Sequence, residues 1–152
     1  MLLFYVSDDR YAISGSQVVE VIPLVELKKL ARSPNYVAGL LNYRGRIIPV
    51  IDLCQLLAEQ PYRHHLSTRI IVVNYLGEEQ TPYLLGLIAE RVTETLDIRE
   101  TDLIDSGIQV DAAPYLGQII TDQHGMIQCI QVESLLSESQ RKYLLPEPER
   151  LT

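Results

Sequence analysis

The sequence contains no tryptophan, a single phenylalanine and only two cysteines among its 152 residues. Proteins that bind single-stranded nucleic acids use basic grooves with stacking aromatic side chains, so this composition argues against that function. Twenty aspartates and glutamates outnumber 13 lysines and arginines, which gives a formal charge of -7. Because phosphate contacts need clustered basic residues, we expect no nucleic-acid partner.

The two cysteines are predicted to be free. Cys54 and Cys129 each lie in an apolar segment, where a thiol behaves as a small hydrophobic side chain. A disulfide between them is the less favoured alternative. The three histidines are His64, His65 and His124, and a metal site needs several ligands at suitable spacing. We therefore expect no metal.

Long hydrophobic runs are also absent. The stretch from Tyr83 to Ala89 is among the longest and falls far short of the roughly 20 residues that a membrane-spanning helix requires. Met1 leads directly into an apolar strand-like segment without a basic leader or a cleavage site, so no signal peptide is expected. We predict a cytoplasmic protein with no direct membrane insertion.

Motifs of the common enzyme classes are missing. The sequence has no glycine-rich phosphate loop, no His-Glu-x-x-His and no Gly-x-Ser-x-Gly. Carboxylates such as Asp8, Asp102 and Asp111 fall in expected turns, where a solvated turn residue is a simpler interpretation than paired acid–base catalysis. We predict that the chain is not an enzyme and uses no cofactor.

What the sequence does contain is a series of short segments rich in Val, Ile, Leu and Tyr, separated by turn residues. This pattern is typical of an all-β barrel or sandwich. Asp52 is suited to cap a short helix from Leu53 to Glu59, and a terminal helix is expected from Leu135 to Tyr143. The expected strands are Leu2–Ser7, Arg10–Ser14, Gln17–Pro23, Val37–Asn42, Arg46–Ile51, Arg69–Tyr75, Tyr83–Leu96, Tyr115–Thr121 and Met126–Val132.

A faint internal repeat indicates two matching halves. IIPVIDLCQLL, which starts at Ile47, matches MIQCIQVESLL, which starts at Met126, and both follow a glycine turn. QVVEVI at Gln17 and RVTETL at Arg91 form a second match in the same order. We expect one domain over residues 1–145, with subdomains of about 1–66 and 67–145, followed by a disordered tail over residues 146–152.

Two charged residues lie among apolar ones. Glu20 is flanked on both sides by aliphatic residues, and an unpaired buried carboxylate would cost several kcal/mol, so it should have a partner. Arg44 lies in the turn Asn42-Tyr43-Arg44-Gly45 between two apolar runs, with a guanidinium suited to carboxylate contacts. We hypothesise that Arg44 reaches Glu20, either permanently or in competition with a carboxylate of another protein. A purely structural pair or a solvated arginine are the alternatives.

Four motifs follow one another along nearly the whole chain. They are EVIPL from Glu20, PNYVAGLLNYRG from Pro34, IIPVIDL from Ile47 and GLIAERVTETL from Gly86. With these motifs in this order, the sequence resembles the CheW-like coupling proteins of bacterial chemosensory arrays. The resemblance implies a mostly β fold of two small five-stranded β-barrel subdomains, packed on a shared hydrophobic seam with short helices. In this resemblance Glu90 stands where relatives commonly carry an aspartate.

The resemblance also implies a non-catalytic adaptor that couples chemoreceptors to a CheA-type histidine kinase. The implied partners are the cytoplasmic tip of the receptor and the regulatory domain of the kinase, which could belong to a swimming, pilus or light-directed system. Three positions resemble those lining a groove for the receptor, and four resemble a functional tip and its neighbour. The implied partner-binding residues are Val18, Gly39 and Val92 in the groove, and Glu20, Asn42, Arg44 and Gly45 at the tip.

The alternative function is a small β-barrel module that binds a ligand or an oligonucleotide, because barrels of this size often carry such sites. Nine tyrosines keep this alternative open, whereas the acidity of the chain argues against it.

Overall fold

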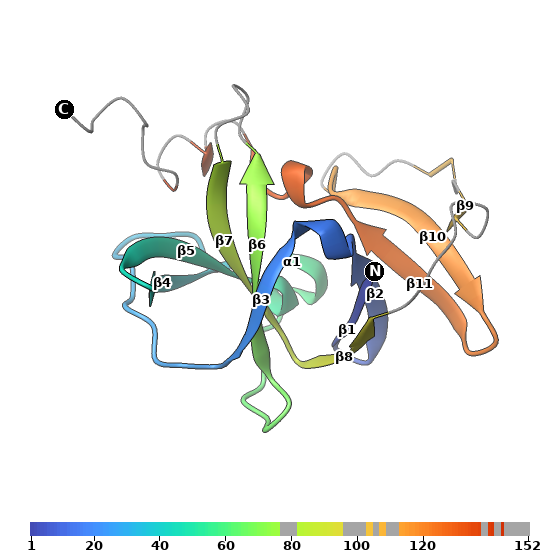
Figure 1. Ribbon diagram of the computed structural model, residues 1–152, viewed down its shortest axis with the longest axis horizontal. Helices are drawn as coiled ribbons and strands as arrows, with labels where there is room; N and C mark the ends of the chain where they lie inside the picture. The colour runs from blue at the N-terminus through green and yellow to red at the C-terminus, as the bar shows by residue number, and fades with distance from the viewer. Residues whose placement is uncertain are drawn as a thin grey trace.

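The computed structural model describes residues 1–76, 82–95, 103–104, 107–108, 113–137, 140–141 and 144. These residues form two β-sheets with little helix (Figure 1). The six-stranded sheet has the order β8-β1-β2-β11-β10-β9, and the five-stranded sheet has the order β3-β6-β7-β5-β4. The strands are β1 (Leu2–Val6), β2 (Asp9–Ile13), β3 (Val18–Pro23), β4 (Val37–Tyr43), β5 (Arg46–Asp52), β6 (Arg69–Leu76), β7 (Pro82–Ala89), β8 (Arg91–Thr95), β9 (Leu103–Ile104), β10 (Leu116–Asp122) and β11 (Gly125–Ile130). The helical segments are α1 (Leu53–Ala58) and the 3-10 turns η1 (Gly15–Gln17) and η3 (Val132–Ser134).

The prediction of a mostly β protein with two β units on a shared seam is confirmed. Strand pairing closes neither sheet into a barrel within the described residues, and one sheet gains a sixth strand, the two-residue β9. The stretch expected as one strand from Tyr83 is divided into β7 and β8, because Glu90 interrupts it. Asp52 caps α1 as expected, and its Oδ1 accepts hydrogen bonds from the backbone N–H groups of Cys54 at 2.9 Å and Gln55 at 3.4 Å.

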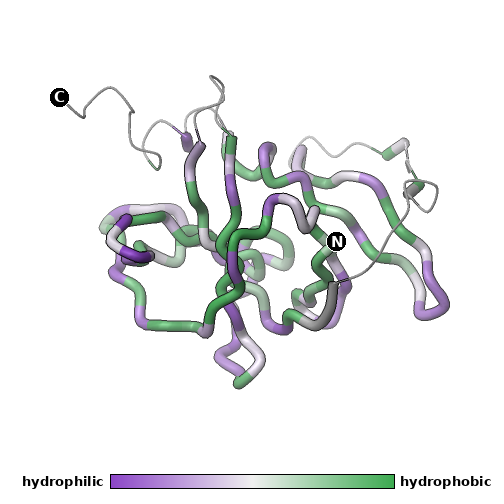
Figure 2. The backbone as a smooth tube through the Cα atoms, viewed as in Figure 1, coloured by the Kyte–Doolittle hydropathy of each residue, from purple (hydrophilic) through white to green (hydrophobic). Residues whose placement is uncertain are grey.

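The largest buried cluster joins the two sheets. Phe4 and Ile13 enter it from the six-stranded sheet, and Ile51 and Leu87 enter it from the five-stranded sheet. Helix α1 contributes Leu53 to the same cluster and contacts both β1 and β7. Hydrophobic residues follow the strands towards this centre, whereas hydrophilic residues gather at turns such as that between β10 and β11 (Figure 2). The shared cluster is therefore the seam that the sequence predicted.

Two smaller clusters explain the apolar runs that the seam does not absorb. One belongs to the five-stranded sheet, where β6 and β7 are central strands whose long apolar runs are buried on both faces. The other lies on the six-stranded sheet. The buried members are Leu41, Tyr43, Ile48, Val50, Ile70, Val72 and Ile88 in the first, and Leu3, Ala12, Ile120, Ile127 and Cys129 in the second.

The chain passes between the sheets twice along the described residues. It leaves the six-stranded sheet after β2, enters the five-stranded sheet through η1, and returns through Glu90 between β7 and β8. Each sheet therefore contains strands from both sides of residue 66, and the expected division into subdomains at that residue stays a prediction. The tail from residue 146 lies outside the described residues, as do parts of the expected terminal helix. No helix among the described residues is long and apolar enough to cross a membrane.

Candidate functional site

The turn between β4 and β5 presents Arg44 at the end of the five-stranded sheet. Tyr43 pairs with Arg46, so Arg44 and Gly45 form a two-residue turn, with φ of 51° and 87°. Positive φ at both positions is the geometry that suits a tight hairpin, and glycine adopts it without strain. The side-chain oxygen of Asn42 accepts a hydrogen bond from the backbone N–H of Gly45 at 3.0 Å. Asn42 and Gly45 thus hold the turn that displays Arg44.

Arg44 reaches Glu20, as hypothesised. Arg44 Nη2 donates to Glu20 Oε2 at 2.9 Å, and the hydroxyl of Tyr43 donates to the same oxygen. This hydrogen bond to the carboxylate raises the pKa of Tyr43. The guanidinium carbon of Arg44 also lies 5.3 Å from the centre of the Tyr43 ring, within the range of a cation–π contact.

The prediction that Glu20 is buried is wrong. Its side chain is 36% exposed, and that of Arg44 is 74% exposed. Neighbouring side chains on a strand point to opposite faces, so Val19 and Val21 face solvent while Glu20 lies on the partly buried side of β3. The aliphatic neighbours in the sequence therefore do not surround the carboxylate in space. The contact is a surface ion pair reinforced by a tyrosine.

The pair also joins the two edges of the five-stranded sheet. Glu20 belongs to β3 and Tyr43 belongs to β4, which are the first and last strands in the order of that sheet. The contact requires the sheet to curl until these edges meet, and side chains rather than a strand ladder bridge them. The five-stranded sheet is thus an open sheet whose two edges are joined by side chains.

Gly39 has a structural reason to be glycine. It lies buried on β4 with φ of 150°, and an added Cβ would be 2.6 Å from the backbone oxygen of Lys28. That close approach follows from an isolated bridge in which Lys28 and Leu40 exchange backbone hydrogen bonds of 2.7 and 3.0 Å. Its assignment to a partner surface stays a prediction.

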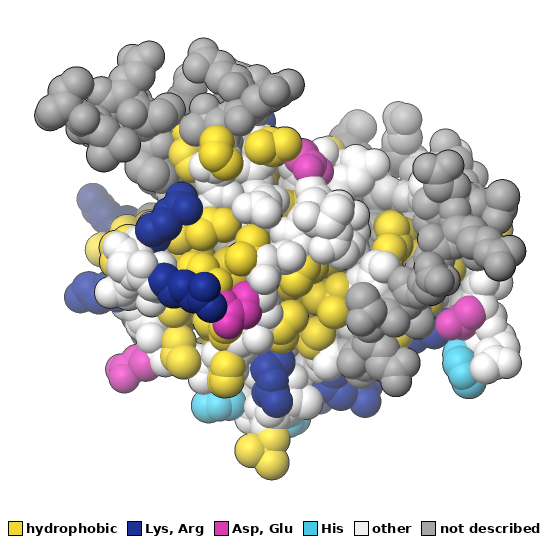
Figure 3. All heavy atoms as spheres, viewed as in Figure 1, with side chains coloured by type: hydrophobic (Ala, Val, Ile, Leu, Met, Phe, Trp, Pro, Cys, Tyr) yellow, Lys and Arg dark blue, Asp and Glu magenta, His cyan; other side chains and the backbone are white. Residues whose placement is uncertain are grey.

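Val18 and Val92 lie at the two places where the chain changes sheet. Val18 opens β3 directly after η1, and Val92 is the second residue of β8, opposite Phe4 of β1. Both are partly buried and pack against the cluster that joins the sheets. Figure 3 shows apolar side chains across the middle of one face of the molecule, beside a group of basic and acidic ones. The two valines thus belong to the seam, whereas the other predicted residues cluster at the tip or, like Gly39, pack against the Lys28 backbone.

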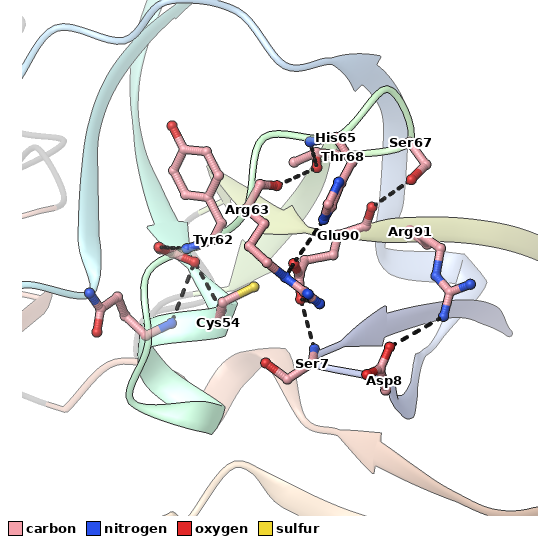
Figure 4. A network of polar contacts seen from close by, with 12 residues as sticks. Ser7, Asp8, Cys54, Tyr62, Arg63, His65, Ser67, Thr68, Glu90 and Arg91 are labelled. Atoms are coloured by element: carbon pink, nitrogen blue, oxygen red, sulfur yellow. Dashed lines mark hydrogen bonds and ion pairs between the residues drawn. The ribbon is translucent and has the colours of Figure 1, made fainter.

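Sequence reasoning did not select Glu90, which forms a denser polar network than the tip (Figure 4). Its carboxylate binds Arg63 through Nε at 2.6 Å and Nη2 at 3.3 Å, and accepts the backbone N–H of Ser7 at 2.8 Å. Arg63 holds the pKa of Glu90 below its usual range, against the effect of burial. The available signal was a carboxylate directly after a long apolar strand, where burial of the charge requires partners.

The polar side chains of the described residues include no group of three or more His, Cys, Asp or Glu that could hold a metal ion. A shallow depression of about 350 Å³ lies between residues 23–24 and the segment 64–69, with His64, His65 and Arg69 in its lining. The guanidinium of Arg69 is bonded to the backbone oxygens of Leu66 and Thr68.

Comparisons with known proteins assign the chain to a family. The family model described as CheW-like domain matches residues 1–140, so the chain belongs to the CheW-like domain family. It is similar to the chemotaxis protein CheW of Bacillus subtilis, with 26% identity over 149 residues that cover 97% of this chain and 92% of the relative. It is also similar to protein FrzA of Myxococcus xanthus, with 30% identity over 110 residues that cover 72% of this chain and 66% of the relative.

A solved structure supports the same conclusion. The scaffolding protein TtCheW from Thermoanaerobacter tengcongensis matches with a TM-score of 0.74 and 29% identity, covering 85% of this chain and 86% of that one. Together with the relatives, this structure supports a scaffold role in chemotaxis signal transduction.

Proposed function

We propose that this chain is a non-catalytic adaptor that couples chemoreceptors to a CheA-type histidine kinase. The Bacillus subtilis relative is named chemotaxis protein CheW, and the similar solved structure is described as a scaffolding protein. Both descriptions support a role in assembly. The observation that carries the proposal is Arg44, displayed on a tight turn at the open end of a curled sheet. The proposed place is the cytoplasm, because the receptor tips and the kinase are cytoplasmic.

The kinase contact is assigned to the tip. A guanidinium carries five N–H donors in a rigid fork, and the 74% exposure of Arg44 lets a carboxylate of the partner reach them. Glu20 and Tyr43 hold the side chain in one orientation, which lowers the entropy lost on binding. Asn42 and Gly45 act one step back, because they stabilise the turn.

The receptor contact is assigned to the seam. Val18 and Val92 are on edge strands of different sheets, and both lie against the shared apolar cluster. The family resemblance implies an apolar groove at these positions, and an amphipathic helical hairpin is the kind of partner that docks into such a groove. Gly39 is included in this proposal indirectly, because its close contact with the Lys28 backbone positions β4. Two separate contacts on one rigid body hold receptor and kinase in a fixed geometry, and their effects on assembly multiply.

The proposal is tested by calorimetric titration of the protein with a CheA-type regulatory domain and with a receptor tip fragment. Arg44→Ala should weaken kinase binding about tenfold or more, the loss expected for a central interface arginine. Arg46→Ala is the matched control, because Arg46 is an exposed arginine two residues away, on β5. It should change the affinity less than about twofold.

Stability separates recognition from a structural role. An exposed ion pair contributes about 0–1 kcal/mol, so Arg44→Ala should leave the melting temperature nearly unchanged. A large fall in melting temperature, with binding lost only in proportion to the unfolded fraction, would make the tip structural. Failure of the wild-type protein to bind either partner would refute the adaptor function itself.

A further inference from the structure

Glu90 is the single residue between β7 and β8, and it therefore connects the five-stranded sheet to the six-stranded sheet. Its side chain is only 5% exposed. A buried carboxylate costs several kcal/mol unless other groups compensate its charge and fill its lone pairs. The groups that compensate Glu90 come from segments that lead to different sheets.

The carboxylate contacts one segment on each side, and Oε1 contacts both, because it also accepts Arg63 Nη2 at 3.3 Å. Oε1 accepts the backbone N–H of Ser7, which lies in the turn between β1 and β2 of the six-stranded sheet. Oε2 accepts Arg63 Nε at 2.6 Å, and Arg63 belongs to the segment that leads into β6 of the five-stranded sheet. His65 Nε2 lies 3.8 Å from Oε2. Figure 4 shows the side chains of Arg63 and His65 on one side of the Glu90 carboxylate and the backbone nitrogen of Ser7 on the other.

The backbone of Glu90 repeats the pattern. Its N–H donates to the backbone oxygen of Tyr5 in β1 at 3.1 Å, and its carbonyl oxygen accepts the hydroxyl of Ser67 at 3.1 Å. Nearby, Arg91 Nη2 lies 3.9 Å from Oδ1 of Asp8, which belongs to the same β1–β2 turn. Through both its backbone and its side chain, Glu90 thus connects β1 and the β1–β2 turn of one sheet to the segment that precedes β6 of the other.

The junction lies next to the seam. Val92 follows Glu90 by two residues, so any change in the direction of the chain at Glu90 moves β8 relative to the five-stranded sheet. At the other crossing, η1, Ser14 and Ser16 share a local side-chain hydrogen bond, and Gln17 donates to Glu133 of a distant segment. Of the two crossings among the described residues, the one at Glu90 has more polar contacts, and these add directional constraints to the apolar cluster that joins the sheets.

We propose that Glu90, held by Ser7 and Arg63, is a positioning residue that sets the orientation of the two sheets. Through this orientation it sets the relative placement of Val18 and Val92 at the seam, on which receptor affinity depends. The second statement rests on the proposed adaptor function, whereas the first does not. Glu90 itself contacts no partner, because it is buried.

The orientation is measured directly by electron paramagnetic resonance distances between spin labels on the two sheets. Asn74→Cys on β6 and Gln118→Cys on β10 place the labels on exposed positions, and the native cysteines are buried. In this background, Glu90→Gln keeps the shape of the side chain but removes its charge. We expect the distance distribution to shift or broaden by about 2 Å or more, the scale of a rearrangement between packed units.

Asp122→Asn is the matched control. Asp122 forms an ion pair with Arg10 at 2.7 Å, and both residues belong to the six-stranded sheet. This substitution also replaces a paired carboxylate by an amide, but it should leave the distribution unchanged because no contact between sheets is lost. If Glu90→Gln does not fold, Arg63→Gln removes the same contact from a side chain that is 58% exposed.

Binding provides the second measurement. Glu90→Gln should weaken binding of the receptor fragment by about fivefold to tenfold. It should change kinase binding less than about twofold, because the Arg44 turn and Glu20 belong to one sheet. An unchanged distance distribution in Glu90→Gln and Arg63→Gln would overturn the proposal and make the network a local stabiliser. Equal losses for both partners would overturn the link to the seam. If the wild-type protein binds neither partner, the adaptor function fails while the distances still decide the orientation.

Discussion

Replacing Gly39 by alanine should destabilise the protein far more than an exposed loop substitution does. The added Cβ would lie 2.6 Å from the backbone oxygen of Lys28 and 3.1 Å from Cβ of Leu27. Backbone cannot move aside as the end of a flexible side chain can. Either the strand or the Lys28 segment must shift, and the bridge between Lys28 and Leu40 is then lost.

The expected loss comes from two sources. A residue other than glycine at such a φ costs about 1–3 kcal/mol. The two backbone hydrogen bonds of the Lys28–Leu40 bridge contribute about 0.5–1.5 kcal/mol each. We therefore expect a loss of about 2–6 kcal/mol, out of about 5–15 kcal/mol for a typical domain. For a chain of this length, a loss of about 4 kcal/mol, the middle of that range, lowers the melting temperature by roughly 8–16 °C.

Two other glycines provide graded controls. Gly45 has φ of 87° but no atom within 4 Å of an added Cβ, so Gly45→Ala should cost only the backbone strain, about 1 kcal/mol. A Cβ added at Gly15 would lie 4.0 Å from its nearest neighbour, so Gly15→Ala should be neutral or slightly stabilising. Urea denaturation followed by far-ultraviolet circular dichroism measures all three, and does not need tryptophan fluorescence.

The result that would refute this reasoning is a Gly39→Ala variant that loses no more stability than Gly45→Ala. The same variant also tests the predicted partner role of Gly39. If it acts through stability alone, kinase and receptor binding should fall only with the folded fraction. A loss of receptor binding in the fully folded variant would instead support a direct place in the groove.

Three further predictions follow from buried polar groups. Because Arg63 lowers the pKa of Glu90, the stabilisation by this carboxylate is complete above the ordinary glutamate pKa of about 4.3 and is lost as the pH falls towards the folded value. The difference in unfolding free energy between wild type and Glu90→Gln should therefore shrink below about pH 4.3 in urea titrations; a constant difference would contradict the pairing. Asp52→Ala removes the cap of α1 and should cost about 1–3 kcal/mol by denaturation, whereas a loss below 0.5 kcal/mol would show that water replaces the carboxylate. Burial raises the pKa of Cys54 to about 12 and also raises that of Cys129, so a thiol reagent should label both only in denaturant, and rapid native labelling would contradict their burial.

Local patterns were enough to predict much of this fold. The Gly45 turn, flanked by apolar strands, predicted the β4–β5 hairpin, and Asp52 before an apolar run predicted the cap of α1, because both signals act within a few residues. The two β units on a shared seam were predicted by the family resemblance. Sheet membership was not predictable in this way, since β11 pairs with β2 in parallel across more than a hundred residues.

The candidate site shows the same limit. The pairing of Arg44 with Glu20 was inferred from chemistry alone, and the structure shows the two in contact. The burial of Glu20 was misjudged because it has four aliphatic neighbours in the sequence. Two of them, Val19 and Val21, lie on the opposite, exposed face of the edge strand β3. Glu90 was not selected, since its partners Ser7 and Arg63 are 83 and 27 residues away in the chain.

The part of the chain that the structure describes contains two arginine–glutamate pairs with different surroundings, and burial separates their roles. In the Arg44–Glu20 pair both side chains are substantially exposed, so exchanging Glu20 for a carboxylate of a partner changes the stability by about 1 kcal/mol at most. In the Arg63–Glu90 pair the carboxylate is 5% exposed, and loss of its partner would leave a buried charge, which costs about 3 kcal/mol or more in the fully buried limit. The half-exposed Arg63 lets water reduce that cost, but breaking the Arg63–Glu90 pair still costs more stability than breaking the Arg44–Glu20 pair. A contact that must open for a partner belongs in the first environment, and a contact that must hold two sheets in one orientation belongs in the second.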